Sequence, residues 1–191
     1  SPYIPGSSLK GKVRSLLEVS SGCNQTSNFK RNDYRGETGL LIAEIFGNAG
    51  GNDRTDTGDQ SRVIFRDANL SPQSKLALLN SNYTDTDYTE IKTETAIDRV
   101  RGMAKSGSLR QFERVPAGAV FHFSVVINVV ADSDTTAVEK EEKYLNLIKA
   151  GLKLLEDDYL GGCGSRGYGQ IKLNIDWNNI EHKAVEAYFK H

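Results

Sequence analysis

The sequence predicts an α+β domain, because amphipathic helical runs occur in it together with stretches typical of β-strands. The clearest helical run is 138–155, where Leu145, Ile148 and Leu152 recur at a spacing that places them on one helix face. The clearest strand-like stretch is VFHFSVVINVV, residues 120–130, which is rich in β-branched and aromatic side chains. The chain therefore combines both kinds of element.

Two further helices are expected near the start of the chain. Residues 8–18 carry apolar side chains at helical spacing, and the turn PGS before them supplies a candidate N-cap. A second helical run, 40–46, ends at Gly47, since glycine is common directly after a helix. The stretch NAGGNDRTDTGDQS, residues 48–61, then has the composition of a loop.

Two further strands are expected. RVIFRDANL, residues 62–70, is a short apolar stretch, and in residues 171–177 apolar side chains alternate strictly with polar ones. The alternation predicts a half-buried strand after the last helix. We find no internal repeat and no linker that would split the chain, so residues 1–191 are expected to form one domain.

The composition limits the class of protein. With 191 residues, 38% of them hydrophobic and 26% charged, the chain suits one globular domain. Cys23 and Cys163 lie far apart and outside any metal-binding pattern, which favours a reducing compartment. No stretch resembles a signal peptide or a membrane span, so we expect a soluble, cytoplasmic protein without a membrane partner. The net charge of -1 does not by itself indicate nucleic acid.

The stretch YLGGCGSRGYGQIKL holds five glycines within residues 161–169. Gly162, Gly164 and Gly167 match the spacing of the dinucleotide-binding fingerprint, which requires a strand before the glycines and a helix after them. Here a helix precedes and a strand is expected to follow, so a cofactor-binding enzyme is disfavoured. No Walker lysine follows the glycines either.

Two interpretations of this glycine-rich loop remain. A backbone with little side-chain bulk can approach a ligand closely, and Ser165 and Arg166 are placed to contact phosphate. The alternative is a tight turn between helix and strand that needs glycine only for its backbone angles. Five glycines and an arginine exceed what such a turn needs, which favours phosphate binding.

The segment PGSSLKGKVR has a similar character. Lys10 and Arg14 lie four residues apart on one helix face, Lys12 lies near the same end, and Ser7 and Ser8 stand at the positive pole of the helix. Such a helix end attracts phosphate. The alternative is a capped surface helix whose lysines face solvent.

A third stretch, 91–114, is locally cationic, with Lys92, Arg99, Arg101, Lys105, Arg110 and Arg114 against three acidic residues. Its alternative interpretation is a solvated hairpin.

Together these segments resemble a known family. YIPGSSLKGKVRSLLE, RVIFRDA, ETAIDRV, RQFERV and GLKLLEDDYLGGCGSRGYGQI are similar to the backbone subunit of type III CRISPR effector complexes, a member of the RAMP superfamily. The likeness is greatest to the subunit of the III-A and III-D kind that polymerises along CRISPR RNA and cuts bound target RNA. It runs from about Pro2 to about Leu173, and PGSSLKGK and GGxGSRGYG are its most specific parts.

The resemblance implies a ferredoxin-like fold, similar to the RNA-recognition motif, with its first strand mostly missing and a thumb hairpin inserted at about 88–118. It also implies that two segments hold the sugar-phosphate backbone of the guide RNA. Their residues here are Ser7, Ser8, Lys10, Lys12, Arg14, Gly162, Gly164, Ser165 and Arg166. Main-chain amides and cations read no bases, which suits a protein that must accept any guide.

In the family, the thumb wedges into the duplex of guide and target at regular intervals. The resemblance implies that the apolar side chains Ile97, Val100 and Met103 press on a displaced base, and that the cations Arg99, Arg101 and Arg110 contact phosphate. The partners it implies are guide CRISPR RNA, target RNA, copies of the same chain and other type III effector subunits. The protein would serve antiviral defence.

The resemblance implies target cleavage with magnesium or manganese, whereas guide binding needs no cofactor. The family's cleavage depends on an aspartate in a loop upstream of PGSS, and residues 1–4 contain no acidic side chain, so the catalytic residue is unknown. A non-catalytic scaffold subunit is the alternative. His122 lies within an apolar stretch and is expected in the core, whereas Asp67, Asp157 and Asp158 are expected to be structural or solvated.

Overall fold

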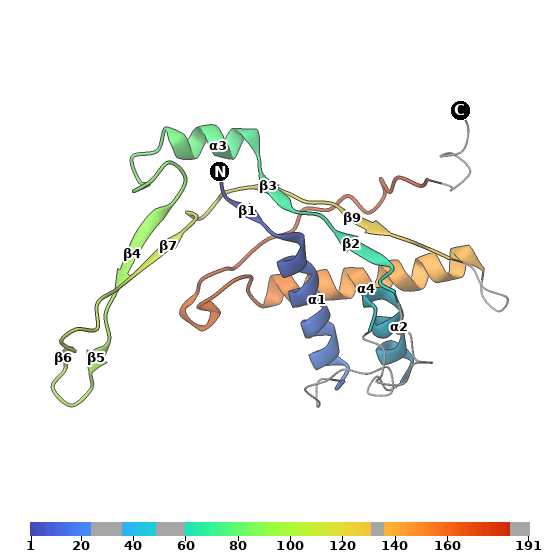
Figure 1. Ribbon diagram of the computed structural model, residues 1–191, viewed down its shortest axis with the longest axis horizontal. Helices are drawn as coiled ribbons and strands as arrows, with labels where there is room; N and C mark the ends of the chain where they lie inside the picture. The colour runs from blue at the N-terminus through green and yellow to red at the C-terminus, as the bar shows by residue number, and fades with distance from the viewer. Residues whose placement is uncertain (24–35, 49–59, 131–135, 184–191) are drawn as a thin grey trace.

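The computed structural model describes residues 1–23, 36–48, 60–130 and 136–183. In this part of the chain, α1 (Gly6–Ser20), α2 (Gly36–Phe46) and α4 (Ala137–Asp157) gather on one side of a set of antiparallel strands (Figure 1). The helices predicted over 8–18, 40–46 and 138–155 are confirmed; α1 and α4 extend beyond both predicted ends by one or two residues, and α2 begins earlier but ends at the predicted Phe46. The prediction of a mixed helix-and-strand fold is confirmed as well.

Two small sheets lie beside these helices, and their strands are β1 (Tyr3–Ile4), β2 (Val63–Phe65), β3 (Ala68–Leu70), β8 (Phe121–His122) and β9 (Val125–Ile127). β3 lies between β1 and β8, and β2 pairs with β9. The strands predicted over 62–70 and 120–130 are therefore each divided in two. Across the break at Arg66-Asp67, the Arg66 N–H still donates to the Ser124 carbonyl at 3.0 Å.

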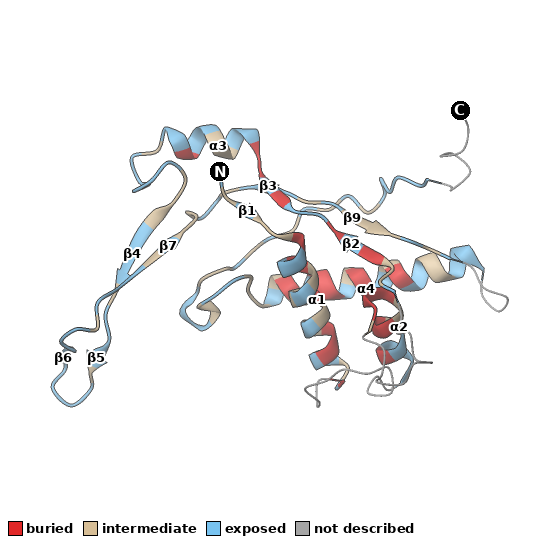
Figure 2. Ribbon diagram, in the orientation of Figure 1, coloured by how far each residue is buried: buried red, intermediate tan, exposed pale blue. Residues whose placement is uncertain are grey.

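The hydrophobic core lies between the sheets and the three helices. On α1 it buries Leu9, Val13 and Leu17, and on α4 it buries Tyr144, Ile148, Leu152 and Leu155. Figure 2 shows the buried positions gathered on these helices, on α2 and on β2. No helix in the described ranges is long and apolar enough to cross a membrane.

The prediction of a strand over 171–177 is wrong. The expected alternation of burial is present, and Ile171, Leu173, Ile175 and Trp177 pack against the core, but no strand includes these residues. The segment packs on the core cluster, and the Leu173 N–H donates to Glu156 Oε1 of α4 at 2.6 Å. Side-chain alternation requires an apolar surface to pack on, which a helix can supply as well as a sheet.

Two further local features differ from expectation. His122 is exposed, so its expected core position is wrong; Phe121, its neighbour on the two-residue strand β8, packs against the core instead. An unexpected helix, α3 (Pro72–Leu79), follows β3. The sequence contains a signal for this helix, because Ser71 is a favoured N-cap residue and Pro72 a favoured first helical residue. In the structure, the Ser71 hydroxyl accepts from the Ser74 N–H at 3.1 Å.

A long hairpin extends away from the three core helices (Figure 1). Its inner part pairs β4 (Glu90–Glu94) with β7 (Arg110–Arg114), and its outer part pairs β5 (Ile97–Asp98) with β6 (Met103–Ala104). The hairpin falls within the expected insertion at about 88–118.

The start of α1 is fixed against the segment that joins β2 to β3. The Gly6 N–H donates to Asp67 Oδ1 at 2.8 Å, and a Cβ at Gly6 would lie 2.1 Å from the Phe65 carbonyl oxygen. Only glycine therefore fits at this contact. Asp67 has the structural role that we expected, because its carboxylate satisfies an N–H at the positive end of α1.

We expect Asp67→Ala to lower the free energy of unfolding by about 1–2 kcal/mol, because a helix-terminal N–H loses a charged acceptor. Asp67→Asn keeps an oxygen acceptor and should retain most of the stability. Urea denaturation measures both, with Asp87→Ala at an exposed aspartate as the control. Equal stability of Asp67→Ala and the control would contradict the structural role.

Candidate nucleic-acid interface

The glycine-rich loop follows α4 and is closed by a backbone hydrogen bond from the Leu160 N–H to the Gly169 carbonyl at 2.9 Å. Within it, Gly164–Arg166 forms a short 3-10 turn. A Cβ at Gly164 would lie 2.0 Å from the ring of Tyr159, and a Cβ at Gly169 would lie 2.0 Å from the Leu160 carbonyl oxygen. Close packing thus requires glycine at both positions.

Two more glycines of the loop, Gly161 and Gly167, have positive φ angles of 87° and 82°. Only Gly162 has neither a positive φ nor a close neighbour. The folded shape of the turn therefore accounts for four of the five glycines. The count of glycines, which favoured phosphate binding in the sequence, does not by itself require a ligand.

The backbone amides of the loop give a more direct indication of binding. None of the N–H groups of residues 161–165 donates a hydrogen bond to another described residue, and Gly161, Gly162 and Ser165 are exposed. The loop thus presents a run of consecutive unpaired donors. Runs of this kind bind anions, because several N–H dipoles converge on one acceptor.

Arg166 lies beside these amides and contacts the inner part of the hairpin. Its Nη1 donates to Glu94 Oε2 at 2.8 Å, and its guanidinium lies 5.7 Å from the ring centroid of Phe112. The bond to Glu94 raises the pKa of Arg166. The pKa of Glu94 is lowered, first by the hydrogen bond from the Tyr168 hydroxyl and then by Arg166.

The amino-terminal half of α1 reaches the same loop through one side chain. Lys12 Nζ lies 2.7 Å from Asp158 Oδ2 and 4.1 Å from the ring centroid of Tyr159. Ser7 and Ser8 are exposed in the first turn of α1. Asp158 was expected to be structural or solvated, and its ion pair with Lys12 confirms a structural contact.

The other two cations of α1 have partners elsewhere. Lys10 Nζ donates to Ser61 Oγ at 2.6 Å and to the Val63 carbonyl at 3.1 Å, and burial followed by the nearby Arg14 lowers its pKa. Arg14 Nε lies 2.7 Å from Glu18 Oε1 on the next turn. The structure therefore brings Lys12 to the glycine-rich loop. Lys10 instead contacts β2 and Ser61 before it, and Arg14 contacts Glu18 on the same helix.

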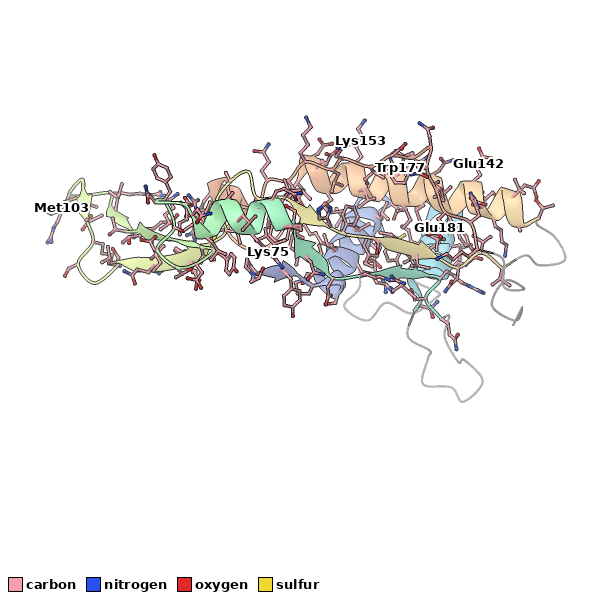
Figure 3. All side chains as sticks on the ribbon, turned by 90° about the horizontal axis from the view of Figure 1, so that it is seen from above. Lys75, Met103, Glu142, Lys153, Trp177 and Glu181 are labelled. Carbon is pink, nitrogen blue, oxygen red and sulfur yellow. The ribbon has the colours of Figure 1, made fainter. Side chains whose placement is uncertain are left out.

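The apolar hairpin residues of the sequence prediction lie in its outer part. The side chains of Ile97, Val100 and Met103 are 68%, 96% and 59% exposed, and Figure 3 shows Met103 at the far end of the molecule. Arg99, Arg101 and Arg110 are exposed as well. Exposed apolar groups are costly in water, so this surface is suited to contact with another molecule.

A metal site is not formed by the residues that the structure describes. In those ranges, no three side chains of histidine, cysteine, aspartate or glutamate lie close enough together to hold an ion. The magnesium or manganese expected for cleavage therefore stays a prediction.

Comparison with known proteins identifies the family. The sequence pattern of the RAMP superfamily matches residues 1–172, which is most of the chain. The chain belongs to the RAMP superfamily.

Named relatives of this RAMP chain include CRISPR system Cms endoribonuclease Csm3 of Methanocaldococcus jannaschii, 45% identical over 173 residues that cover 89% of this chain and 62% of the relative. The protein of the same name from Streptococcus thermophilus is 38% identical over 170 residues, covering 89% of this chain and 68% of the relative. The chain thus spans less than two thirds of the first relative's length.

Solved structures support the RAMP fold. The crystal structure of Methanopyrus kandleri Csm3 has a TM-score of 0.57 at 22% identity and covers 90% of this chain and 63% of that one. A chain of a type IV-B CRISPR complex has a TM-score of 0.56 at 15% identity, covering 96% of this chain and 77% of that one. At these identities the likeness shows the fold alone.

Sequence reasoning missed the residues that hold the loop in place. Glu94 fixes Arg166, and Tyr168 and Asp158 complete the contacts of the loop with the hairpin and α1. Tyr168 could have been found, because it lies inside the quoted GSRGYG motif. Glu94 carries no local signal, since it lies 72 residues before Arg166 and was counted only as an acidic residue among cations.

We expect Lys10→Ala to lower the free energy of unfolding by about 1–3 kcal/mol, because two acceptors near β2 lose their charged donor. Thermal and urea unfolding measure the change. Lys153→Ala is the matched control, since Lys153 is exposed on α4 and projects away from it in Figure 3. If both variants are equally stable, the contacts of Lys10 do not contribute to folding.

Proposed function

We propose that the chain is a guide-RNA-binding backbone subunit of a type III CRISPR interference complex, and that the protein cuts target RNA paired with the guide. The observation that carries the proposal is the relationship to proteins named CRISPR system Cms endoribonuclease Csm3, at up to 45% identity over most of the chain. Because the chain spans only part of the first relative, its activity and partners are proposals and not findings.

The geometry of the loop supports binding of a phosphate backbone. Consecutive amides that donate to no described residue and a half-exposed arginine offer donors and positive charge but no group arranged to read a base edge. Contacts of this kind are independent of sequence. They suit a subunit that must hold guides of many sequences.

The hairpin supports a second part of the proposal. A ferredoxin-like RAMP domain carries it as a thumb, and its exposed apolar and cationic side chains press on a displaced base and contact phosphate in the duplex of guide and target. Copies of the chain would then line up along one guide beside other type III subunits. This activity belongs in the cytoplasm, where guide and invading transcripts meet.

Cleavage chemistry is assigned to residues outside those that the structure describes. No described group of side chains fits a metal ion, and Asp67 and Asp158 each have a structural partner. We therefore derive no catalytic step from the described residues. An aspartate upstream of Pro5, with magnesium or manganese, remains the proposed source of the activity.

We expect Arg166→Ala to weaken binding of single-stranded RNA about three- to tenfold, equally for unrelated sequences, because one charge-assisted phosphate contact is lost. The dependence of affinity on salt should become shallower by about one phosphate contact. Filter binding at several salt concentrations measures both quantities. Lys153→Ala removes the same charge from an exposed position on α4 outside the loop and should change neither, whereas equal effects of the two variants would remove Arg166 from the site.

We expect the chain as printed to hold guide RNA without cutting a paired target, because the carboxylates beside the loop, Asp158 and Glu94, are already engaged by Lys12, Arg166 and Tyr168. The assay incubates guide-loaded protein with labelled target in magnesium or manganese. It compares the printed chain with a longer form that includes an upstream aspartate and with that form carrying Asp→Ala. Regular cleavage by the printed chain would contradict the assignment, and no cleavage by the longer form would favour a scaffold subunit.

A further inference from the structure

Glu94 connects two segments that are remote in sequence. It lies at the end of β4 in the hairpin, and its Oε2 accepts from Nη1 of Arg166, 72 residues later, at 2.8 Å. Its other oxygen, Oε1, accepts from the Tyr168 hydroxyl and lies 3.8 Å from Lys92 Nζ. Both carboxylate oxygens therefore have partners, and the side chain is 23% exposed.

The position of Glu94 does not depend on Arg166 alone. The ring of Tyr168 lies 4.7 Å from Lys92 Nζ and 4.8 Å from the guanidinium carbon of Arg114, both on the hairpin. Arg114 Nε in turn lies 2.5 Å from Glu90 Oε1. Tyr168 is thus held by two cations, and it holds Glu94 in place.

Arg166, in contrast, lies on a loop and is 48% exposed. A guanidinium has five N–H donors in a rigid plane, and the bond to Glu94 uses the Nη1 nitrogen. The remaining donors face no hydrogen-bond acceptor among the described residues. A fixed guanidinium of this kind can bind a second anion without first losing rotational freedom.

We propose that Glu94 is a positioning residue for RNA binding: it fixes the guanidinium of Arg166 beside the loop amides and joins the hairpin to the phosphate site. The proposal rests on the proposed function, because it concerns the same loop. The contact between Glu94 and Arg166 makes the orientation of the hairpin depend on the glycine-rich loop, which is the segment proposed to hold the guide backbone. A phosphate bound at the loop is thereby placed at a defined distance from the hairpin.

A carboxylate beside a phosphate site could instead act as a competitor that RNA must displace. The two roles predict opposite results for Glu94→Gln, which keeps the size of the side chain but removes its charge. Competition and simple electrostatics both predict tighter RNA binding, because the protein becomes more positive. Positioning predicts weaker binding, because Arg166 loses the partner that holds it.

The experiment measures binding of single-stranded RNA of two unrelated sequences to the chain over a series of salt concentrations. The matched control is Glu113→Gln, which makes the same charge change on the opposite hairpin strand, where Glu113 is exposed and, among the described residues, accepts from the Thr89 hydroxyl alone at 2.5 Å. We expect Glu94→Gln to weaken binding about three- to fivefold and to reduce the salt slope, whereas the control leaves affinity unchanged or higher.

A double-mutant cycle with Arg166→Ala separates positioning from general loss of structure. In the Arg166→Ala background, Glu94→Gln should no longer weaken binding, because the group that it positions is gone. Hydrogen exchange without RNA is a second measurement: the hydrogen-bonded amides of Arg166 and Gly167 should exchange faster in Glu94→Gln than in the control.

The outcomes distinguish this inference from the proposed function. If the unmodified chain shows no salt-dependent RNA binding, the proposed function fails and the inference fails with it. If the chain binds RNA but Glu94→Gln binds as tightly as Glu113→Gln or more tightly, only the inference is overturned. An equal loss of binding in the Arg166→Ala background also overturns it, since Glu94 then acts without Arg166.

Discussion

The contact between Gly6 and the stretch Phe65 to Asp67 is the constraint on which the site depends. It leaves no room for a side chain at Gly6, and it places the positive end of α1 against the break between β2 and β3. From that point α1 packs on α4, whose end leads into the glycine-rich loop. The loop thus lies beside α1 because the start of α1 is fixed, and the ion pair of Lys12 with Asp158 joins them directly.

The distribution of charge in the site explains how a chain of net charge -1 can be suited to RNA. Lys10, Lys12 and Arg14 each contact a partner within the protein, so they contribute to folding as well as to the local potential. At the glycine-rich loop, the described groups left to meet a phosphate are main-chain amides and part of the Arg166 guanidinium. Such donors add attraction without a large excess of basic residues.

The sequence alone predicted the elements that depend on a local pattern of side chains. The apolar spacing of 138–155 predicts α4, and the PGSS turn predicts the start of α1 to within two residues. It was insufficient where tertiary contacts decide: the alternation of 171–177 reflects packing on the core cluster without strand pairing, and the break at Arg66-Asp67 divides an apolar stretch. The loop could be located from its glycines, but its link to Glu94 exists only because the fold brings the hairpin beside it.

The two interpretations of the glycine-rich loop are not true alternatives. Positive φ at Gly161 and Gly167, and close packing at Gly164, require glycine for the turn alone. In the turn that these angles form after α4, the amides of residues 161–165 donate to no residue that the structure describes. Turns that alternate between right-handed and left-handed angles direct successive N–H groups toward one point and so form anion sites. The glycines therefore shape the turn, and the turn, rather than the glycines themselves, creates the donors for phosphate.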